Sequence, residues 1–334
     1  MNAEVAAPTL ILSRADIAGL MEANAWLAAV EIGFAALAEG KADAPPPMAI
    51  AGCGGIFHAK GASLQLDRLY VALKLNGNFP DNPAMRQLPT IQGAILLCDG
   101  ESGALLAIID SIEVTLRRTA AASALAARFL ARPDSQTILI CGCGAQGQAH
   151  LAALREALPL RRCFAWDRDR ARADLFAQEM SGAALTVEAV DDPAAARKSD
   201  VIVTCTTSRV PYLEATLVSP GTFVAAVGAD SPEKSEISPE LMATARVVAD
   251  SIDQCAIMGD LHHAIRAAAM ARGDVHAELA ELLTGAKAGR TSESQITLFD
   301  STGTAVQDVA AAALLYERAC RAPGQLTVAL GAGA

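Results

Sequence analysis

The segment TILICGCGAQGQAH at residues 137–150 constrains the fold more than any other part of this chain. Its apolar start predicts a strand, and residues 148–158 place leucines on one face of a helix. Between them lies a G-x-G-x-x-G sequence, which in this strand-loop-helix context is a signature of dinucleotide binding. Glycine lets the backbone approach a pyrophosphate, and the helix N-terminus offers it free N–H groups. The predicted contacts are Gly142, Gly144, Ala145, Gln146 and Gly147.

The cysteines of this segment raise a competing interpretation, a metal site or a redox disulfide. Cys141 and Cys143 form only a C-x-C pair, and no second Cys or His pair stands at zinc-finger spacing to complete a ligand set. We therefore predict no metal. The eight cysteines of the chain show no framework spacing, so we expect most of them to be reduced and buried.

The choice between NAD and NADP depends on Asp167, which lies about 20 residues beyond the last glycine. This residue ends CFAWD, a predicted second strand, where a carboxylate accepts hydrogen bonds from the adenosine ribose. Because a carboxylate would repel a 2′-phosphate, NAD is the predicted cofactor. Arg168, next in the chain, leaves NADP open.

With 334 residues, the chain is long for one core, which predicts two domains. From residue 137 onward, short apolar runs alternate with helical or loop segments, as in a parallel sheet covered by helices. Ser13 and Asp16 form a capping box early in the chain. The earlier part predicts a strand and a helix at 9–21, a helix at 24–40, a β-rich block with a hairpin at 69–110, and a long helix at 111–131. The predicted fold class is α/β, a Rossmann-type doubly wound domain with a second, α+β domain.

Charge and hydropathy argue against several classes of partner. With 27 basic and 37 acidic residues the net charge is −10, which disfavours nucleic acid or an anionic membrane but leaves small anionic substrates open. The N-terminus lacks the pattern of a signal peptide, and no apolar run approaches the roughly 20 residues needed to cross a bilayer. We therefore expect a cytoplasmic protein with no nucleic-acid or membrane partner.

Several stretches together resemble the ornithine cyclodeaminase/mu-crystallin family. They cover most of the chain in the family's order: LKLNGNFPDN (73–82), LLAIIDSIEVTLRRTAAAS (105–123), CGCGAQGQAH (141–150), AAVGADSPEKSE (225–236), RVVADS (246–251) and ITLFDSTGTAVQD (296–308). The resemblance implies a dinucleotide domain inserted into a substrate domain, and we place the bounds at 1–125, 126–307 and 308–334. It also implies that the β-rich domain forms a homodimer.

The activities known in this family concern α-amino and α-imino acids. Ornithine is converted to proline with loss of ammonia, cyclic imines or ketimines are reduced, and alanine is oxidised. The resemblance therefore implies an NAD(H)-dependent cyclodeaminase, imine reductase or amino acid dehydrogenase that moves hydride at the α-carbon of a small amino or imino acid. The alternative is a non-catalytic protein of mu-crystallin type that binds NAD(P)H and a small ligand.

Three residues match the family's substrate and acid/base positions. Lys74 and Arg118 correspond to cations that bind the substrate carboxylate, and Asp230 corresponds to an aspartate near the substrate amine. We predict catalytic roles for Asp230 and Lys74. From the residues alone, Lys74 alternates with Leu73 and Leu75 as on a solvated strand face. The alternative for Asp230 is that GADSP forms a turn in which this residue serves as an N-cap, a role that is compatible with the catalytic one.

Met48 departs from the family pattern, because many cyclodeaminases have an arginine for the substrate carboxylate shortly after this proline run. Downstream, Lys60 is a candidate replacement for that cation, and His58 is a candidate proton donor because histidine titrates near neutral pH. Both residues could instead be exposed polar groups at a strand end. The departure weakens the case for ornithine as the substrate.

Further cofactor contacts are predicted outside the glycine loop. They are Thr119, Thr206, Ser301, Thr302 and Gly303, the last three near the nicotinamide by resemblance to the family's late glycine motif. Lys234 and Asp308 also match family positions, and we expect them to organise loops.

Overall fold

The computed structural model describes residues 8–330. They form two compact units, of which the first runs up to Arg118 and resumes at Thr304, and the second is Thr119–Gly303. The first break lies inside a continuous helix, α4 (Ser111–Leu130), so no turn signal marks it in the sequence. Both breaks lie a few residues before the limits expected at 125/126 and 307/308, and the expected outer limits lie outside the described residues.

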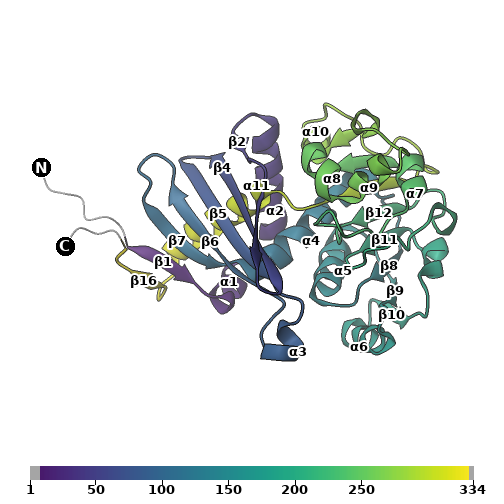
Figure 1. Cartoon of the computed structure of the whole chain (residues 1–334), viewed down its shortest axis with the longest axis horizontal. Helices are drawn as coiled ribbons and strands as arrows, with labels where there is room; N and C mark the ends of the chain where they lie inside the picture. Colours follow the sequence, from purple (N-terminus) through teal and green to yellow (C-terminus); the bar gives the residue numbers. More distant parts are fainter. Residues whose placement is uncertain (1–7, 331–334) are drawn as a thin grey trace, which may run out of the picture. The chain divides into compact units, whose positions relative to one another are not determined.

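A mixed sheet with helices packed on it makes up the first unit (Figure 1). The strand order is β16-β1-β7-β6-β5-β4-β2 with β3 paired to β4, and every pair except β1 with β7 is antiparallel. The strands are β1 (Thr9–Leu12), β2 (Ala42–Asp43), β3 (Met48–Gly52), β4 (Gly55–Gln65), β5 (Leu69–Asn78), β6 (Ile91–Asp99), β7 (Leu105–Asp110) and β16 (Leu326–Val328). The helices are α1 (Arg14–Leu20), α2 (Ala23–Ala38), α3 (Asn82–Arg86), the beginning of α4, and α11 (Ala305–Arg321).

Local sequence signals explain several of these elements. The predicted capping box of Ser13 and Asp16 is confirmed at the start of α1, and the predicted hairpin is confirmed as β6 and β7. Helix α11 lies across β4, β5 and β6 and beside α2. The two helices approach closely because residue 33 is glycine, where a Cβ would be 3.0 Å from the Val306 carbonyl oxygen. The C-terminal helix thereby covers one face of the sheet.

The covered face of this sheet contains Lys74. Tyr70 and Lys74 on β5 are buried on the side of α11, whereas Leu73 and Leu75 on the opposite face are 46% and 44% exposed. The interpretation of Lys74 as a residue on a solvated strand face is therefore wrong. Alternation assigns the lysine and the leucines to opposite faces, but it does not say which face a helix covers.

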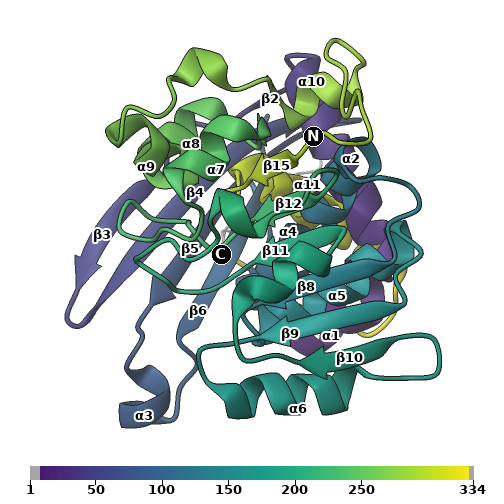
Figure 2. The same cartoon turned by 90° about the vertical axis from the view of Figure 1, so that its right-hand side faces the viewer.

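Eight parallel strands form the sheet of the second unit, in the order β10-β9-β8-β11-β12-β15-β13-β14 (Figure 2). They are β8 (Thr137–Cys141), β9 (Arg162–Trp166), β10 (Thr186–Ala189), β11 (Val201–Thr204), β12 (Phe223–Ala226), β13 (Arg246–Ala249), β14 (Ala277–Glu278) and β15 (Thr297–Asp300). The apolar runs predicted as strands are all confirmed. Strands β11, β12 and β15 are buried along their whole length, which is why they show no polar alternation.

The strand order of this sheet reverses at β8. Strands β9 and β10 lie on one side of it and β11 and β12 on the other, which is the predicted doubly wound arrangement. Ligands of open α/β sheets bind at such a reversal, outside the carboxyl ends of the strands. The helical segments are α5 (Ala145–Ala157), α6 (Arg170–Met180), η1 (Pro193–Lys198), η2 (Ala215–Leu217), α7 (Pro239–Thr244), α8 (Ile252–Met258), α9 (Asp260–Arg266), η3 (Arg272–Asp274) and α10 (Leu279–Leu283).

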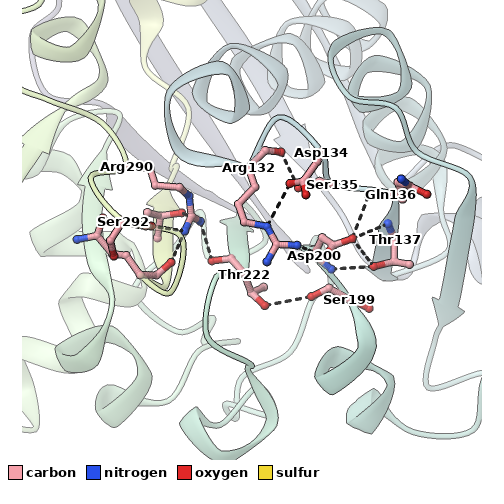
Figure 3. Close-up of polar contacts among 12 residues, drawn as sticks. Arg132, Asp134, Ser135, Gln136, Thr137, Ser199, Asp200, Thr222, Arg290 and Ser292 are labelled. Carbon is pink, nitrogen blue, oxygen red and sulfur yellow. Dashed lines mark hydrogen bonds and ion pairs between the residues drawn. The ribbon is translucent and has the colours of Figure 1, made fainter.

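Two arginines fix the amino-terminal edge of the same sheet (Figure 3). Arg132 Nη2 donates to Asp200 Oδ1 at 2.6 Å, and the other oxygen of Asp200 accepts from the Thr137 backbone N–H at 2.9 Å. Arg290 Nη2 donates to the Thr222 carbonyl at 3.2 Å, and burial lowers the pKa of Arg290 to about 10. These bonds hold the fold together at this edge. The predicted cofactor residues in the loops after β8, β9, β11 and β15 lie at the opposite, carboxyl edge.

No single helix within residues 8–330 is long and apolar enough to span a membrane. Helices α1 and α2 pass that test only together, by length and composition, as a pair bent by 92°. Within α2, Trp26, Val30 and Phe34 are buried in the core of the first unit.

Candidate active site

Each of the three glycines in the loop after β8 is required for a different structural reason. Gly142 has a φ of +106°, and a Cβ there would lie 2.8 Å from the Cys205 carbonyl oxygen. A Cβ at Gly147 would lie 2.2 Å from the Gly142 carbonyl oxygen, so this glycine allows α5 to pack on the loop. At Gly144 no atom lies within 4 Å of the Cβ position. The second glycine therefore leaves open space beside the backbone, as a pyrophosphate requires.

The N-terminus of α5 has the features of an anion-binding site. Its N-cap, Gly144, provides no side-chain cap, so the first N–H groups remain available. Ala145 is exposed, and Gln146 is half-buried with a buried Oε1 that has no hydrogen-bond partner in the described structure. Asp167 follows β9 and reaches the same loop, where its Oδ2 accepts from the Cys143 N–H at 2.9 Å. The residues present thus fit a dinucleotide, with Arg168 exposed beside Asp167.

The surroundings of the two cysteines in this loop favour neither a metal site nor a redox disulfide. Cys141 is buried at the end of β8 and Cys143 is buried in the loop. Burial raises the pKa of both thiols, which disfavours the thiolate that a metal or a disulfide exchange would need. All eight cysteines are free, and residues 8–330 contain no group of three or more His, Cys, Asp or Glu side chains placed to hold a metal ion.

Asp250, which the sequence analysis did not single out, holds the predicted nicotinamide loop. It follows β13 and is fully buried, and its Oδ2 accepts from the Gly303 N–H at 2.6 Å and from Ser301 Oγ at 2.9 Å. Its Oδ1 lies 3.3 Å from Thr302 Oγ1. Gln254 donates to the Gly303 carbonyl at 3.1 Å. The loop after β15 is therefore fixed by a carboxylate from the neighbouring strand.

Two more predicted site residues, Thr206 and Asp230, follow β11 and β12 at the carboxyl edge of the second unit's sheet. Thr206 donates from its N–H and its Oγ1 to Glu236 Oε1, at 2.6 Å each. Asp230 lies in the loop that joins β12 to α7, and its carboxylate forms an ion pair with Lys234 Nζ at 2.5 Å. The Asp230 side chain is 49% exposed, and no helix begins there, so the N-cap interpretation is wrong.

Glu236 is a second residue that the sequence analysis missed. Its carboxylate is fully buried, and burial raises its pKa. Four donors from Thr206, Tyr212 and Gly228 favour the ionised form. Its position after a turn-rich stretch gives no pattern that identifies it as buried.

The first unit contains a buried cluster of two cations and one carboxylate. Lys74 Nζ lies 2.5 Å from Asp308 Oδ2, and Arg118 Nε lies 3.0 Å from Asp308 Oδ1. Arg118 Nη1 also donates to Gln307 Oε1 at 3.0 Å. Thr115 Oγ1 is 3.5 Å from Lys74 Nζ. The expectation that Asp308 organises a loop is wrong, because it lies on α11 and joins that helix to β5 and α4.

The electrostatics of this cluster follow from its burial. Both cationic side chains are 4% exposed and Asp308 is 2% exposed. Burial lowers the pKa of Lys74 to about 7. The negative charge of Asp308 acts to raise this pKa, and the positive charges of Arg118 and Lys60 lower it further. Burial raises the pKa of Asp308, but Lys74 and Arg118 outweigh it, so the pKa of this carboxyl is lowered overall. The three groups carry one net positive charge when Lys74 is protonated, which suits an anionic ligand.

Lys60 and His58 lie within β4, and both are half-buried. Lys60 is directly opposite Lys74 in the β4–β5 register, and His58 is opposite Asn76. The interpretation of both residues as exposed groups at a strand end is therefore wrong. Met48 begins β3, pairs with Ala59 and is 56% exposed.

Comparison with known proteins shows to which family the chain belongs. A profile of the ornithine cyclodeaminase/mu-crystallin family matches residues 7–322. The chain belongs to the ornithine cyclodeaminase/mu-crystallin family. The resemblance predicted from the sequence is therefore confirmed.

Individual relatives in the ornithine cyclodeaminase/mu-crystallin family are similar over nearly the whole chain. An alanine dehydrogenase of Archaeoglobus fulgidus is 36% identical over 93% of this chain and 95% of its own length. The structure of an archaeal alanine dehydrogenase dimer with bound NAD has a TM-score of 0.92, with 34% identity over 97% of this chain and 99% of that one. The Δ1-pyrroline-2-carboxylate reductase of Thermococcus litoralis, solved with NADH and L-proline, has a TM-score of 0.91, with 31% identity over 96% of this chain and 100% of that one.

The family fold distributes the predicted residues over both units. The first unit brings Lys74, Arg118 and Lys60 to one face of its sheet. The second unit places the glycine loop, Asp167, Thr206, Asp230 and the 301–303 loop at the carboxyl edge of its sheet. Thr119 is buried on α4 directly after Arg118.

Proposed function

We propose that this protein is an NAD(H)-dependent enzyme that moves a hydride at the α-carbon of a small amino or imino acid. The observation that carries the proposal is the buried cluster of Lys74, Arg118 and Asp308 in the first unit. Burying two cations with only one carboxylate costs more desolvation free energy than burying one cation with one carboxylate, and a purely structural ion pair would not need the second cation. An α-carboxylate bound by the guanidinium and the ammonium would balance the remaining positive charge.

The second unit provides the proposed cofactor site. Gly142, Gly144 and Gly147 shape the loop, and the N-terminus of α5 at Ala145 and Gln146 faces the pyrophosphate. Asp167 would accept hydrogen bonds from the ribose hydroxyls of the cofactor. The rest of the cofactor would be contacted by Thr119, Thr206, Ser301, Thr302 and Gly303. The nicotinamide, when bound, accepts or supplies the hydride. The half-buried carboxylate of Asp167 favours NAD over NADP, and dissociation constants for the two reduced cofactors would test this.

Residues of the chain then handle binding and protons. Arg118 and Lys74 would hold the substrate carboxylate and so orient its α-carbon. Asp230, with an ion-paired and half-exposed carboxylate, would accept a proton from the substrate nitrogen in the oxidative direction and return it in the reductive one. Lys74 has a pKa of about 7, so its Nζ can also hold or release a proton near neutral pH.

Lys60 and His58 are the proposed specificity elements. The position of Lys60 opposite Lys74 supports a role for this cation in place of the arginine that Met48 does not provide. An added positive charge disfavours the cationic side chain of ornithine. We therefore favour an imine reductase or an amino acid dehydrogenase over a cyclodeaminase.

One assay separates these reactions. Purified protein is given L-ornithine with a trace of NAD, L-alanine with NAD, or Δ1-pyrroline-2-carboxylate with NADH, while ammonia, proline and nicotinamide absorbance are recorded. Stoichiometric cofactor turnover with alanine or the imine supports the proposal. Ammonia and proline far beyond the NAD present would identify a cyclodeaminase. Tight NADH binding without turnover on any substrate would favour the non-catalytic binding protein.

We also propose that the protein is a homodimer through the uncovered face of the first unit's sheet. Val71, Leu73, Leu75 and Leu96 on that face are 38–46% exposed, which is unusual for large apolar residues on neighbouring strands. A cavity of about 830 Å³ opens on the same face. In light scattering, Leu73→Glu with Leu75→Glu should give a monomer, whereas Val210→Glu, at an apolar residue 70% exposed in the second unit, should leave a dimer.

A cytoplasmic location remains part of the proposal. The free state of all eight cysteines supports a reducing compartment. Recovery of the native protein from a membrane or secreted fraction of its source cells would contradict it.

A further inference from the structure

The Glu236 carboxylate makes contact with two loops at the carboxyl edge of the second unit's sheet. Its Oε1 accepts from the N–H and the Oγ1–H of Thr206, at 2.6 Å each, and from the Tyr212 hydroxyl at 3.0 Å. Its Oε2 accepts from the Gly228 N–H at 2.9 Å. Thr206 follows β11 and Gly228 follows β12, so one buried side chain ties together the ends of two adjacent strands.

The bond to Gly228 also closes a loop. Residues 228–236 leave β12 and return to its end, because the side chain of the last residue binds the backbone of the first. Residue 228 must be glycine for this approach, since a Cβ there would lie 2.4 Å from Glu236 Oε2. Asp230 lies in this loop, and its N–H donates to the Gly228 carbonyl at 3.0 Å. A displacement of Gly228 therefore moves Asp230.

Glu236 is itself held from behind. Its backbone N–H donates to Asp260 Oδ1 at 2.9 Å, and its carbonyl accepts from the N–H groups of Tyr212 and Leu213 at 3.0 Å each. Asp260 is fully buried at the start of α9. The carboxylate thus projects from a backbone that is held by hydrogen bonds at both its N–H and its carbonyl.

We propose that Glu236 is a positioning residue that sets the Asp230 loop relative to the Thr206 loop. This inference rests on the proposed function, in which Asp230 exchanges the proton and Thr206 contacts the cofactor. A carboxylate can accept from all four donors, whereas the amide of glutamine would direct an N–H₂ donor at one of the two backbone N–H groups. Glu236→Gln therefore displaces at least one loop while it keeps the side chain's size.

The first test is a kinetic cycle with Glu236→Gln, Asp230→Asn and the double variant. Misplacement by about 1 Å lowers turnover about 100-fold, so Glu236→Gln should lower kcat by that order with a much smaller change in KM. If Glu236 acts through Asp230, the double variant will be no slower than Asp230→Asn alone. Multiplied losses in the double variant, or an unchanged kcat in Glu236→Gln, would overturn the inference.

Tyr212→Phe is the matched control. It removes one donor from the same carboxylate, at 3.0 Å, and leaves the bonds that Glu236 accepts from Thr206 and from the Gly228 N–H intact. Its kcat should stay close to that of the parent protein. A loss as large as that of Glu236→Gln would mean that general packing around the carboxylate, and not the placement of the two loops, governs turnover.

Amide hydrogen exchange tests the inference without any turnover. The amides of Thr206 and Gly228 should be protected in the parent protein and in Tyr212→Phe, and both should lose protection together in Glu236→Gln. Rapid exchange of either amide in the parent, or loss at only one loop in the variant, would overturn the inference. If the parent protein turns over no amino or imino acid, the proposed function fails, and the exchange result still decides the role of Glu236.

Discussion

Replacing Asp308 with asparagine tests the buried cluster most directly. At an effective dielectric constant of about 20, an ion pair at roughly 3 Å contributes about 5 kcal/mol, and desolvation of the carboxylate offsets part of this. Removing one partner of a buried pair typically costs about 3–5 kcal/mol, because the other charge is left uncompensated. Lys74 can lose its proton, since burial has already lowered its pKa to about 7, but Arg118 cannot. We therefore expect Asp308→Asn to destabilise the first unit by about 3 kcal/mol.

The sign of the pH dependence follows from the pKa of Lys74. Its folded pKa, about 7, lies below its ordinary value of 10.5, so the unfolded chain binds more protons between these values and stability rises with pH in that window. In Asp308→Asn the attraction that raises the pKa of Lys74 is absent, so the window begins at a lower pH. The deficit of the variant should therefore be larger near about pH 5.5 than near about pH 8.

The two tryptophans allow this measurement to be confined to the first unit. Trp26 is buried on α2 in the first unit, and Trp166 ends β9 in the second. In a Trp166→Phe background, urea unfolding followed by fluorescence reports on Trp26 alone. Glu39→Gln is the control, because Glu39 also forms an ion pair in the first unit, with Lys41, but is 53% exposed, and the change should shift the midpoint very little. An Asp308→Asn midpoint equal to that of the control, or a deficit that does not vary with pH, would refute the reasoning.

Three further predictions concern the second unit. Asp230→Asn should retain the dissociation constant for NADH but lower kcat by about 10²–10⁴-fold, and unchanged turnover would remove it from the mechanism. Gly147→Ala should abolish NADH binding, because its Cβ would lie 2.2 Å from a carbonyl oxygen, whereas Gly182→Ala, which has no atom within 4 Å, should bind normally in a fluorescence titration. Asp250→Asn should weaken NADH binding because an amide cannot accept all the bonds that hold the 301–303 loop, and a parent-like dissociation constant would contradict this.

Local patterns in the sequence were sufficient to predict the second unit's architecture. Its strands are short apolar runs because both faces of a parallel sheet are covered, and such runs are visible without any partner. The strand, glycine loop and helix are equally local, because they follow one another in the chain, and a Cβ at Gly147 would meet the Gly142 carbonyl of the same loop. The Cys205 carbonyl that Gly142 approaches follows β11 and is not part of this local pattern. Candidate cofactor residues near this loop, such as Asp167, follow from its spacing.

Several candidate site residues depend on contacts that no local pattern contains. Asp250 and Glu236 are buried carboxylates, but acidic residues next to strands or turns are more often exposed, so their role becomes visible only with the donors around them. The family resemblance predicted that Lys74 and Arg118 bind the substrate carboxylate. It did not reveal that Asp308 holds both of them.

The sequence by itself determined that Lys74 and its leucine neighbours lie on opposite faces of a strand. Only the tertiary structure decided which face is buried, because α11 returns from the end of the chain to cover the lysine and supplies Asp308 to it. The physical reason is that strand alternation is fixed by backbone geometry, whereas burial of a charge depends on a counter-charge, and here that counter-charge lies 190 residues from Arg118.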